Sequence, residues 1–470
     1  MAVHKICYCL RHLGKRPEQP LIESPQTKLI SAMGSSIVAD TDTTVDTTSR
    51  DTMSSGSYRG SASDSDGSGR SRSHKVGKAD FEMLRCVGKG SFGKVLMVQK
   101  RGTTQIYAMK ILNKEMVAKK HQVEHTWAER QILQENCHPF LVRLRYAFQT
   151  RTKLYLVTEF CNGGELFYHL RRTNGFTETQ MGFYCAEILL ALEYLHQHSC
   201  LYRDLKPENV LLDRDGHVRM ADFGLSKLNM TPTTTTDTFC GTPEYLAPEV
   251  LLQTGYSFAV DWWSLGALAF EMLEARPAFF HTNRRVMCDL IVRAEFRFRR
   301  QVSRHAEKLI RALLTANPRH RLSTATDVKA HPFFRKTNWA SVLSKKVKPP
   351  LVPATSGDRD LRNFDQCFTA EPVWTEMNAS PTGSEPQLKV AASPQPWEDF
   401  SYAASPPSAL KPEGETTPKR TAAFTPFPPV VERPVYAMKE EDAPPPWAGN
   451  RTPSEGSLTS GLEYSIRVEA

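Results

Sequence analysis

The chain has 470 residues, a formal net charge of +9 and a hydrophobic content of 40%, so it could hold one large two-lobed domain with tails or about three ordinary domains. The lack of a secretory h-region and of any apolar run of about 18 residues argues against secretion and against a transmembrane segment. Its ten cysteines show no paired metal-binding spacing and predict reduced thiols in the cytoplasm, with the nucleus left open as a second location.

The beginning of the chain is rich in Ser, Thr, Asp and Gly and poor in aromatic side chains. Such a segment cannot bury enough apolar surface to offset the entropy of ordering, so residues 1–78 are expected to be disordered. Cys7 and Cys9 lie among basic residues and are candidate acylation sites. Ala2 stands where N-myristoylation requires glycine, however, so stable attachment to a membrane is not expected.

The next feature is a glycine-rich run that matches the pattern G-x-G-x-x-G-x-V and consists of Gly88, Lys89, Gly90, Ser91, Phe92, Gly93, Lys94 and Val95. Glycine lets a backbone approach phosphate groups that any Cβ atom would keep away. In dinucleotide-binding proteins such a run opens a helix, but here a β-forming stretch, a turn at 101–103 and a second apolar stretch at 106–110 follow. The run therefore predicts a hairpin that covers phosphates.

Three further elements are predicted from composition and periodicity. Residues 154–161 form an apolar, β-rich run that ends at Asn162-Gly163-Gly164, which indicates a strand entering a hinge. Thr177 and Gln180 form a capping box ahead of a helix whose apolar residues recur at helical spacing. Residues 259–273 are apolar nearly all round, which predicts a helix buried in a large lobe.

The strongest chemical signal comes from the run Tyr-Arg-Asp-Leu-Lys-Pro-Glu-Asn, which ends at Asn209, and from Asp-Phe-Gly, which begins at Asp222. A phosphoryl group in transfer carries dispersed negative charge, so it needs positioning and cations more than covalent help. Asp204 is suited to accept a hydroxyl proton, and Asp222 is suited to bind Mg²⁺. The Asn209 amide oxygen would bind a second Mg²⁺, and Lys206 would neutralise the moving phosphate. A polar surface turn is the alternative, but two long motifs in this order disfavour it.

These runs resemble the catalytic loop and the metal-binding motif of protein kinases. The stretches 201–204, 222–230 and 240–245 make this resemblance more specific. They resemble those of serine/threonine kinases of the A, G and C (AGC) group. Within that group the sequence is most similar in character to protein kinase B and to the serum- and glucocorticoid-regulated and ribosomal S6 kinases. This resemblance implies an α+β, bilobal protein kinase fold with a small β-rich lobe carrying one helix (αC), a large mainly helical lobe, a wrapped C-terminal tail and disordered ends. The expected divisions are 1–78 (disordered), 81–334 (catalytic domain), 335–402 (tail with a hydrophobic motif) and 403–470 (disordered, Pro- and Ser-rich).

The resemblance implies a binding site for ATP and Mg²⁺. Lys110 would grip the α and β phosphates, held by Glu129 of the αC helix, and Thr158 would be the gatekeeper beside the adenine. The implied nucleotide-contacting residues are Gly88, Lys89, Gly90, Ser91, Phe92, Gly93, Val95, Ala108, Lys110, Glu129, Glu159, Cys161, Glu165, Leu211 and Phe364. The catalytic set is Lys110, Asp204, Lys206, Asn209 and Asp222, with Asn209 and Asp222 as the metal ligands.

The resemblance also implies a phosphorylation switch. The segment after Asp-Phe-Gly is rich in threonine, and Thr238 takes the position of the activating phosphosite. Arg203, Lys227 and His125 are the cations that would bind its phosphate. A kinase similar to phosphoinositide-dependent kinase is the expected upstream enzyme, and a threonine-rich loop without a switch is the alternative.

The tail carries the run Trp-Glu-Asp-Phe-Ser-Tyr at 397–402, which resembles the hydrophobic motif F-x-x-F-[ST]-Y. Trp397 and Phe400 would fill a groove on the small lobe beside the αC helix, and phosphorylation of Ser401 would strengthen that docking. A kinase similar to a TOR complex is expected to modify Ser401, while Ser380 is a weaker candidate as the turn-motif phosphosite. A chance aromatic cluster in a disordered tail is the alternative.

Substrate preference is implied by a set of acidic residues. Glu165, Glu208 and Glu271 align with the carboxylates that bind arginines upstream of the target hydroxyl in this group. An apolar pocket for the residue after the target would consist of Phe239, Pro243 and Leu246. The predicted partners are therefore proteins with Ser or Thr in an Arg-x-x-Ser/Thr context, and a monomer without a nucleic-acid partner is expected.

The family pattern also predicts two internal contacts and leaves two departures. Asp261 would anchor the catalytic loop, and Glu249 would pair with Arg321. The first departure is that residues 1–78 contain no lipid-binding domain of the protein kinase B type. The second is that Arg-Leu-Ser stands at 321–323 in place of the usual Arg-Leu-Gly, and that residues 294–301 are unusually basic.

Two rival functions come from other classes. A pseudokinase scaffold is disfavoured because all members of the catalytic set, together with Glu129, are present. A nucleic-acid binder is disfavoured because the positive charge is spread along the chain and is not gathered in one basic run with aromatic residues. The sequence thus favours an active serine/threonine kinase regulated at its activation segment and its tail.

Overall fold

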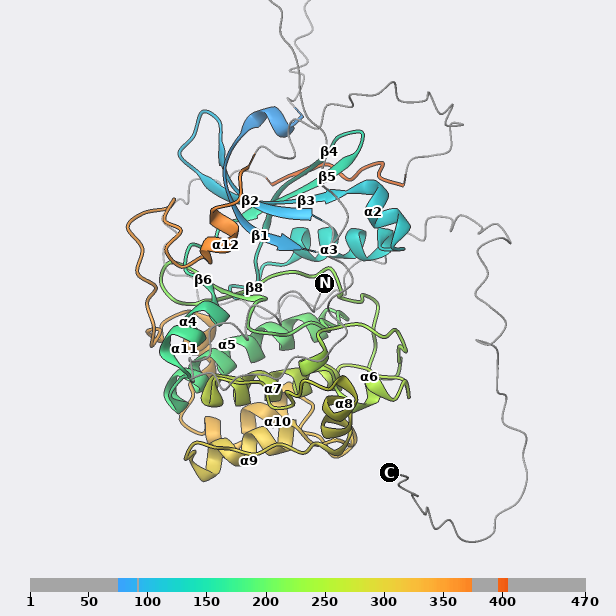
Figure 1. The fold of residues 1–470 in the computed structure, drawn as a ribbon, viewed down its shortest axis with the longest axis vertical. Helices are drawn as coiled ribbons and strands as arrows, with labels where there is room; N and C mark the ends of the chain where they lie inside the picture. The colour runs from blue at the N-terminus through green and yellow to red at the C-terminus, as the bar shows by residue number, and fades with distance from the viewer. Residues whose placement is uncertain (1–74, 91–92, 374–395, 405–470) are drawn as a thin grey trace, which may run out of the picture.

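The computed structural model describes residues 75–90, 93–373 and 396–404. One strand-rich lobe lies against one mainly helical lobe, which confirms the predicted bilobal α+β architecture (Figure 1). Several expected features lie outside the described residues, namely the two end regions up to 74 and from 405, together with Cys7, Cys9, Ser91, Phe92 and Ser380. No helix in the described part of the chain is long and apolar enough to cross a membrane.

The small lobe is built on an antiparallel sheet with the strand order β1-β2-β3-β5-β4-β9. Its strands are β1 (Phe81–Gly90), β2 (Gly93–Lys100), β3 (Ile106–Asn113), β4 (Leu144–Gln149), β5 (Lys153–Glu159) and β9 (Tyr402–Ala403). The register of β1 and β2 runs up to the pair Gly90 and Gly93, so the glycine-rich run lies in a hairpin, as predicted. Glycine is needed at position 93, because a Cβ atom there would lie 1.7 Å from the Ile111 carbonyl oxygen.

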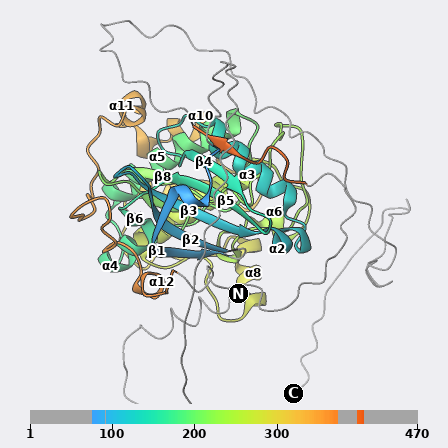
Figure 2. The same ribbon diagram turned by 90° about the horizontal axis from the view of Figure 1, so that it is seen from above.

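Helices and aromatic rings cover the two faces of this sheet. The helices of the small lobe are η1 (Lys78–Asp80), α2 (Lys114–Lys119) and α3 (Val123–Glu135), and α3 contacts β4 (Figures 1 and 2). A separate apolar cluster includes Phe81, Phe148 and Tyr155, in which the rings of Phe148 and Tyr155 stack with centroids 4.7 Å apart. The sheet is therefore packed on both faces, which fixes the strands that carry the nucleotide residues.

The large lobe is mainly helical and has a three-stranded sheet, β6-β7-β8. Its elements are β6 (Gly164–Glu165), α4 (Leu166–Thr173), α5 (Glu178–Gln197), β7 (Val210–Leu212), β8 (Val218–Met220), η2 (Pro243–Tyr245), α6 (Pro248–Leu251), α7 (Ala259–Glu274), α8 (Arg284–Arg293), α9 (Arg304–Leu313), α10 (Ala325–Ala330), η3 (Pro332–Phe334) and α11 (Trp339–Leu343). The predicted capping box begins α5, since the Thr177 and Gln180 side chains each accept from the other's backbone nitrogen. Every residue of α7 after Ala259 is buried, as its composition predicts.

A buried ion pair joins the end of the activation segment to the lower helices. Arg321 donates from its two terminal nitrogens to the two carboxylate oxygens of Glu249, at 2.6 and 2.8 Å, which confirms the expected pairing. Its guanidinium also lies over the Trp263 ring, 4.9 Å from the centroid. Removing one partner of such a pair costs about 3–5 kcal/mol, so this contact holds the segment to the lobe.

The tail runs along one side of the molecule from the large lobe back to the small lobe, and is drawn in orange in Figure 1. On the way it forms α12 (Gln366–Thr369), which contacts β1. Its last described part pairs Tyr402 and Ala403 with Ala147 and Tyr146 of β4, so that β9 extends the small-lobe sheet. The tail is thus part of both lobes' architecture.

Candidate active site

The catalytic loop follows α5 and is anchored by a buried carboxylate. Asp261, in the first turn of α7, accepts hydrogen bonds from the backbone nitrogens of Tyr202 and Arg203 at 3.0 and 2.8 Å, which confirms the expected anchor. Arg203 has a φ of 71°, a left-handed conformation that is costly for a residue with a side chain and is often found at functional sites. The anchor therefore holds the loop in a conformation that it would not adopt alone.

Asp204 lies in the middle of a small polar network. Its carboxylate accepts hydrogen bonds from the Lys206 ammonium at 2.5 Å, the Thr242 hydroxyl at 2.8 Å and the Asn209 amide nitrogen at 2.9 Å. The side chain is only 7% exposed. This set of donors fixes the orientation of the carboxylate, which a group that accepts a hydroxyl proton requires. Thr242, in the activation segment, is thus a direct partner of Asp204.

The nucleotide side is centred on a charged triad. The Lys110 ammonium lies 2.6 Å from a Glu129 oxygen and 2.9 Å from an Asp222 oxygen. Burial alone would lower the pKa of Lys110, but the carboxylates of Asp222 and Glu129 raise it above its ordinary value. The Lys110 charge in turn lowers the pKa of Asp222. Lys110 and Asp222 are therefore both ionised at neutral pH, in contact across the two lobes.

The residues around this triad fit a nucleotide and a divalent metal. Asp222 has a φ of 58°, and its side chain is 51% exposed, so its ionised carboxylate is accessible. Asn209 donates from its amide nitrogen to the Asp204 carbonyl oxygen at 2.8 Å, so its amide oxygen is the atom suited to a metal. Carboxylate and amide oxygens are the donors that hard divalent cations prefer. Bound there, a divalent cation would neutralise phosphate charge.

The small lobe, the hinge and the tail meet at the expected adenine end of the site. Ala108 and Thr158 are paired residues of β3 and β5. Beyond β5, the ring of Phe160 stacks on Phe364 of the tail, with centroids 5.4 Å apart. Cys161 is buried in the hinge, and Glu165 pairs with Leu211 between β6 and β7.

A tail residue that the sequence analysis did not identify also contacts the glycine-rich hairpin. The Glu371 carboxylate lies 3.6 Å from the Lys89 ammonium and 3.2 Å from that of Lys94. These two lysines follow glycine residues of the run on its two strands. A single acidic residue in a polar tail has no distinctive sequence pattern. Only the two lysines of the glycine-rich run could have indicated that an acidic partner lies nearby.

On the substrate side, Glu271 is the most buried of the three expected carboxylates, with an exposure of 4%. The Tyr245 hydroxyl donates a hydrogen bond to it. Burial raises the pKa of Glu271 to about 8, an effect that Tyr245 opposes and that the carboxylates of Glu208 and Glu244 increase. Within the described residues no basic side chain forms an ion pair with Glu271, so a cationic ligand would find an uncompensated acidic group here.

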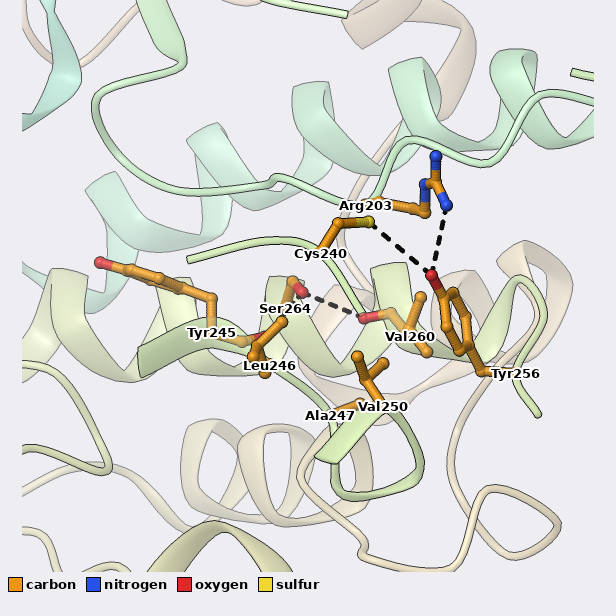
Figure 3. Close-up of a pocket in the computed structure, with 9 residues that line it drawn as sticks. All are labelled: Arg203, Cys240, Tyr245, Leu246, Ala247, Val250, Tyr256, Val260 and Ser264. Atoms are coloured by element: carbon orange, nitrogen blue, oxygen red, sulfur yellow. Dashed lines mark hydrogen bonds between the residues drawn. The ribbon is translucent and has the colours of Figure 1, made fainter. Parts of the chain in front are cut away.

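One of the three residues predicted to form the apolar pocket lines a small cavity. Figure 3 shows a small cavity under the activation segment that includes Leu246, but neither Phe239 nor Pro243 lines it. Phe239 is instead 49% exposed. Tyr256, which the sequence analysis missed, lines this cavity, accepts a hydrogen bond from Arg203 at 3.3 Å and donates to the Thr238 carbonyl oxygen at 2.6 Å. It therefore ties the activation segment to the catalytic loop.

Thr238 is exposed, and two of the three expected cations, Lys227 and Arg203, contact its neighbours Thr236 and Tyr256. Its hydroxyl is 3.4 Å from that of Thr236, which accepts a hydrogen bond from the Lys227 ammonium at 2.8 Å. One terminal nitrogen of Arg203 is buried and makes no hydrogen bond within the described residues. Burial lowers the pKa of His125, and the charges of Arg203 and Lys227 lower it further. These three side chains thus form one cationic cluster, in which Arg203 and Lys227 carry the charge and the lowered pKa leaves the His125 imidazole neutral at neutral pH.

The aromatic residues of the tail fill a groove beside α3. Trp397 stacks on Trp127 of α3 with ring centroids 6.2 Å apart, and Phe400 packs edge-on against the same indole at 5.5 Å. Both tail rings are buried, whereas Ser401 is exposed. The backbone contributes as well, because Arg130 donates from its Nε to the Phe400 carbonyl oxygen at 2.9 Å. Trp127 was not identified from the sequence as the partner of this motif.

A glycine-rich hairpin, a lysine bridged between two carboxylates and an aspartate-centred loop together define a protein kinase catalytic site. The protein kinase domain family matches residues 81–334. A RAC family serine/threonine-protein kinase homolog of Dictyostelium discoideum is 47% identical over 71% of this chain and 74% of its own. Serine/threonine-protein kinase Sgk1 of Homo sapiens is 45% identical over 69% of this chain and 76% of its own. Serine/threonine-protein kinase gad8 of Schizosaccharomyces pombe is 48% identical over 62% of this chain and 52% of its own.

The chain therefore belongs to the protein kinase family, and within it to the AGC group of serine/threonine kinases. Its reaction is the transfer of a phosphoryl group to serine or threonine, with ATP and a divalent metal as the family requires. The predicted family, fold and reaction are thus confirmed. The individual site residues stay predictions, for which the geometry above supplies the support.

Proposed function

We propose that the protein transfers the γ-phosphate of Mg-ATP to serine or threonine residues that have arginine upstream, and that phosphorylation of Thr238 and Ser401 activates it. The observation that carries the substrate preference is the buried Glu271 carboxylate, which meets the Tyr245 hydroxyl and none of the described cations. A substrate guanidinium supplies the missing positive charge. A bidentate arginine contact to a carboxylate is both strong and geometrically selective.

Each polar residue of the cleft has its own role in phosphoryl transfer. Asp204 accepts the proton of the substrate hydroxyl, and Lys206, whose ammonium contacts both Asp204 and Thr242, neutralises the phosphate in transfer. Lys110 positions the nucleotide phosphates, held by Glu129. Asp222 and Asn209 hold Mg²⁺, which supplies charge neutralisation at the phosphates.

Both phosphosites act on α3 through different contacts. A phosphate on Thr238 joins the cationic cluster of His125, Arg203 and Lys227, and His125 belongs to α3. A phosphate on Ser401 lies next to Phe400, whose carbonyl already accepts from Arg130 of α3. The two inputs therefore favour the position of α3 in which Glu129 meets Lys110.

The expected surroundings of the enzyme complete this proposal. Upstream kinases similar to phosphoinositide-dependent kinase and to a TOR complex modify Thr238 and Ser401, respectively. The enzyme acts as a monomer in the cytoplasm, and the nucleus is a second location to examine. Mass spectrometry of the protein from cells would identify the phosphosites, and fractionation of the same cells would test the location.

The direct test is radiolabelled ATP with an oriented peptide library, using the full chain and an Asp222→Ala variant. We expect incorporation that depends on Asp222 and on Mg²⁺, with selection for arginine at the third position upstream of the target. A pseudokinase scaffold would show no incorporation above the variant. Incorporation without selection for arginine would keep the kinase activity but refute the substrate preference.

A further inference from the structure

Four arginine residues lie together beside the ends of α4 and α7. We define this arginine strip as Arg276, Arg297, Arg299 and Arg300. The last three are exposed and belong to the unusually basic segment that the kinase chemistry leaves unexplained. No carboxylate of the described residues forms an ion pair with these three side chains, so the surface carries a net positive charge.

The strip is built by alternating aromatic and basic side chains. Phe296 and Phe298 pack against Phe270 of α7, with ring centroids 5.4 and 5.1 Å away. The residues between and after them, Arg297 and Arg299, are exposed to solvent. The aromatic rings therefore hold the segment on the lobe while the guanidinium groups face outward.

Backbone contacts fix the strip further. Glu274 accepts hydrogen bonds from the backbone nitrogens of Arg299 and Arg300 at 3.0 and 2.9 Å. Arg276 donates to the Arg297 carbonyl oxygen at 2.7 Å and lies 3.6 Å from the second Glu274 oxygen. The Nε of Arg276 is buried and makes no hydrogen bond within the described chain. The one carboxylate in the strip thus organises its backbone, and the outer guanidinium groups are left for a ligand.

The strip lies next to the two helices that carry or follow the proposed arginine-binding carboxylates, α7 with Glu271 and α4 after Glu165. Arg276 lies two residues beyond the end of α7, and the nitrogen of Ala275 before it bonds to the carbonyl oxygen of Glu271. At the other end, a Cβ atom on Gly175 would lie 2.3 Å from an Arg300 nitrogen, so Arg300 packs beside the end of α4. The eight residues of α4 separate this point from Glu165 by about 12 Å, which an extended peptide covers with roughly four residues.

We propose that the arginine strip binds an acidic segment of the protein substrate, about four residues farther upstream of the target hydroxyl than the arginines. The proposal rests on the arginine preference proposed above, because that preference sets the direction of the bound peptide. Opposite charges then select a bipartite substrate, basic near the target and acidic beyond. Several exposed charge pairs act together, so each contributes little and the sum depends on salt.

The test compares three synthetic peptides with the same Arg-x-x-Ser core and an upstream extension of glutamate, glutamine or lysine. With the activated full chain, we expect the glutamate extension to lower KM about fivefold relative to glutamine, at equal kcat, and to lose this advantage at high salt. The Arg297→Ala/Arg299→Ala variant should remove the difference among extensions. Arg319→Ala, which removes an exposed arginine elsewhere on the lobe, should keep it.

The possible outcomes separate the two proposals. Equal KM values for the glutamate and glutamine extensions overturn the acidic-segment proposal while arginine selection survives. If replacing the core arginine by alanine leaves KM unchanged, the arginine preference fails instead. The third arm is sedimentation with phosphatidylserine vesicles. If the protein binds these vesicles through Arg297 and Arg299, and the peptide extension has no effect on KM, the strip is a membrane-binding surface and the peptide ligand is refuted.

Discussion

The nucleotide side and the substrate side of the cleft balance their charges in different ways. On the nucleotide side, Lys110 already lies between Glu129 and Asp222. On the substrate side, the buried Glu271 contacts the Tyr245 hydroxyl, and no described basic side chain pairs with it. The acidic groups of the first side are thus paired with a cation of the protein, whereas the second side keeps an acidic group in a buried position without one.

This difference indicates what each side is built to recognise. Charges that are paired within the protein hold a fixed geometry, which suits a nucleotide that is the same in every reaction cycle. A buried carboxylate without a cation carries a desolvation cost, which the group avoids by binding a proton or which a positively charged ligand offsets. Selectivity among protein substrates is therefore expected to come from the unpaired side.

The largest expected effect tests the base itself, which lies between the two sides. Asp204→Asn keeps the shape of the side chain but removes its ability to accept a proton, and we expect kcat to fall about a thousandfold. Single-turnover phosphorylation with saturating ATP and peptide measures this fall. Asp215→Asn, at a residue whose side chain is 73% exposed, is the matched control and should leave kcat unchanged. A comparable fall in both variants would mean that charge loss in general, and not the base, is responsible.

The second prediction separates the two sides by their KM values. Glu271→Gln removes the acidic group but keeps a hydrogen-bond acceptor for Tyr245, so we expect KM for an arginine-containing peptide to rise about thirtyfold. The KM for ATP should stay within about twofold, because the Lys110 triad is untouched. Steady-state kinetics with each substrate in turn provide both values. An equal rise in both KM values would show that the two sides are not independent.

Much of this architecture was predictable from local patterns. The hairpin at the glycine-rich run, the capping box at Thr177 and the buried helix α7 each depend on short-range spacing, which the sequence displays directly. The contacts of Asp261 with the catalytic loop were also anticipated, because family resemblance carries a long-range contact that spacing alone does not.

The contacts that escaped prediction join segments far apart in the chain. Glu371 meets the glycine-rich hairpin, Trp127 receives the tail rings, and Tyr256 bonds the backbone at Thr238. Each partner is an ordinary polar or aromatic residue without a periodic pattern of its own. The burial that raises the pKa of Glu271 likewise depends on the folded lobe, so the sequence could propose its role but not its protonation.

The third prediction uses that protonation to distinguish the sides by pH. With a pKa of about 8, Glu271 is mostly neutral at pH 6.5 and mostly ionised at pH 8.5, and only the ionised form attracts a substrate arginine. We therefore expect KM for the arginine peptide to fall about tenfold as pH rises over this range. The KM for ATP should change little, because Lys110 and Asp222 stay ionised throughout. Glu271→Gln should abolish the pH dependence of the peptide KM, and its persistence in that variant would assign it to another group.

The smallest predicted effect concerns thermal stability. Neutralising a carboxylate should raise the melting temperature on the substrate side and lower it on the nucleotide side. Since the folded protein binds the Glu271 proton more tightly than the unfolded chain does, the free energy of unfolding falls as pH rises from 4.5 to about 8. Glu271→Gln escapes this loss, so it should match the parent protein at pH 5 and exceed its melting temperature at pH 8.5. Glu129→Gln removes a partner of the Lys110 ammonium and should lower the melting temperature at both pH values. Differential scanning fluorimetry of both variants and the parent protein at both pH values provides the comparison. If Glu271→Gln melts below the parent protein at pH 8.5, the Glu271 carboxylate is stabilised by groups within the fold.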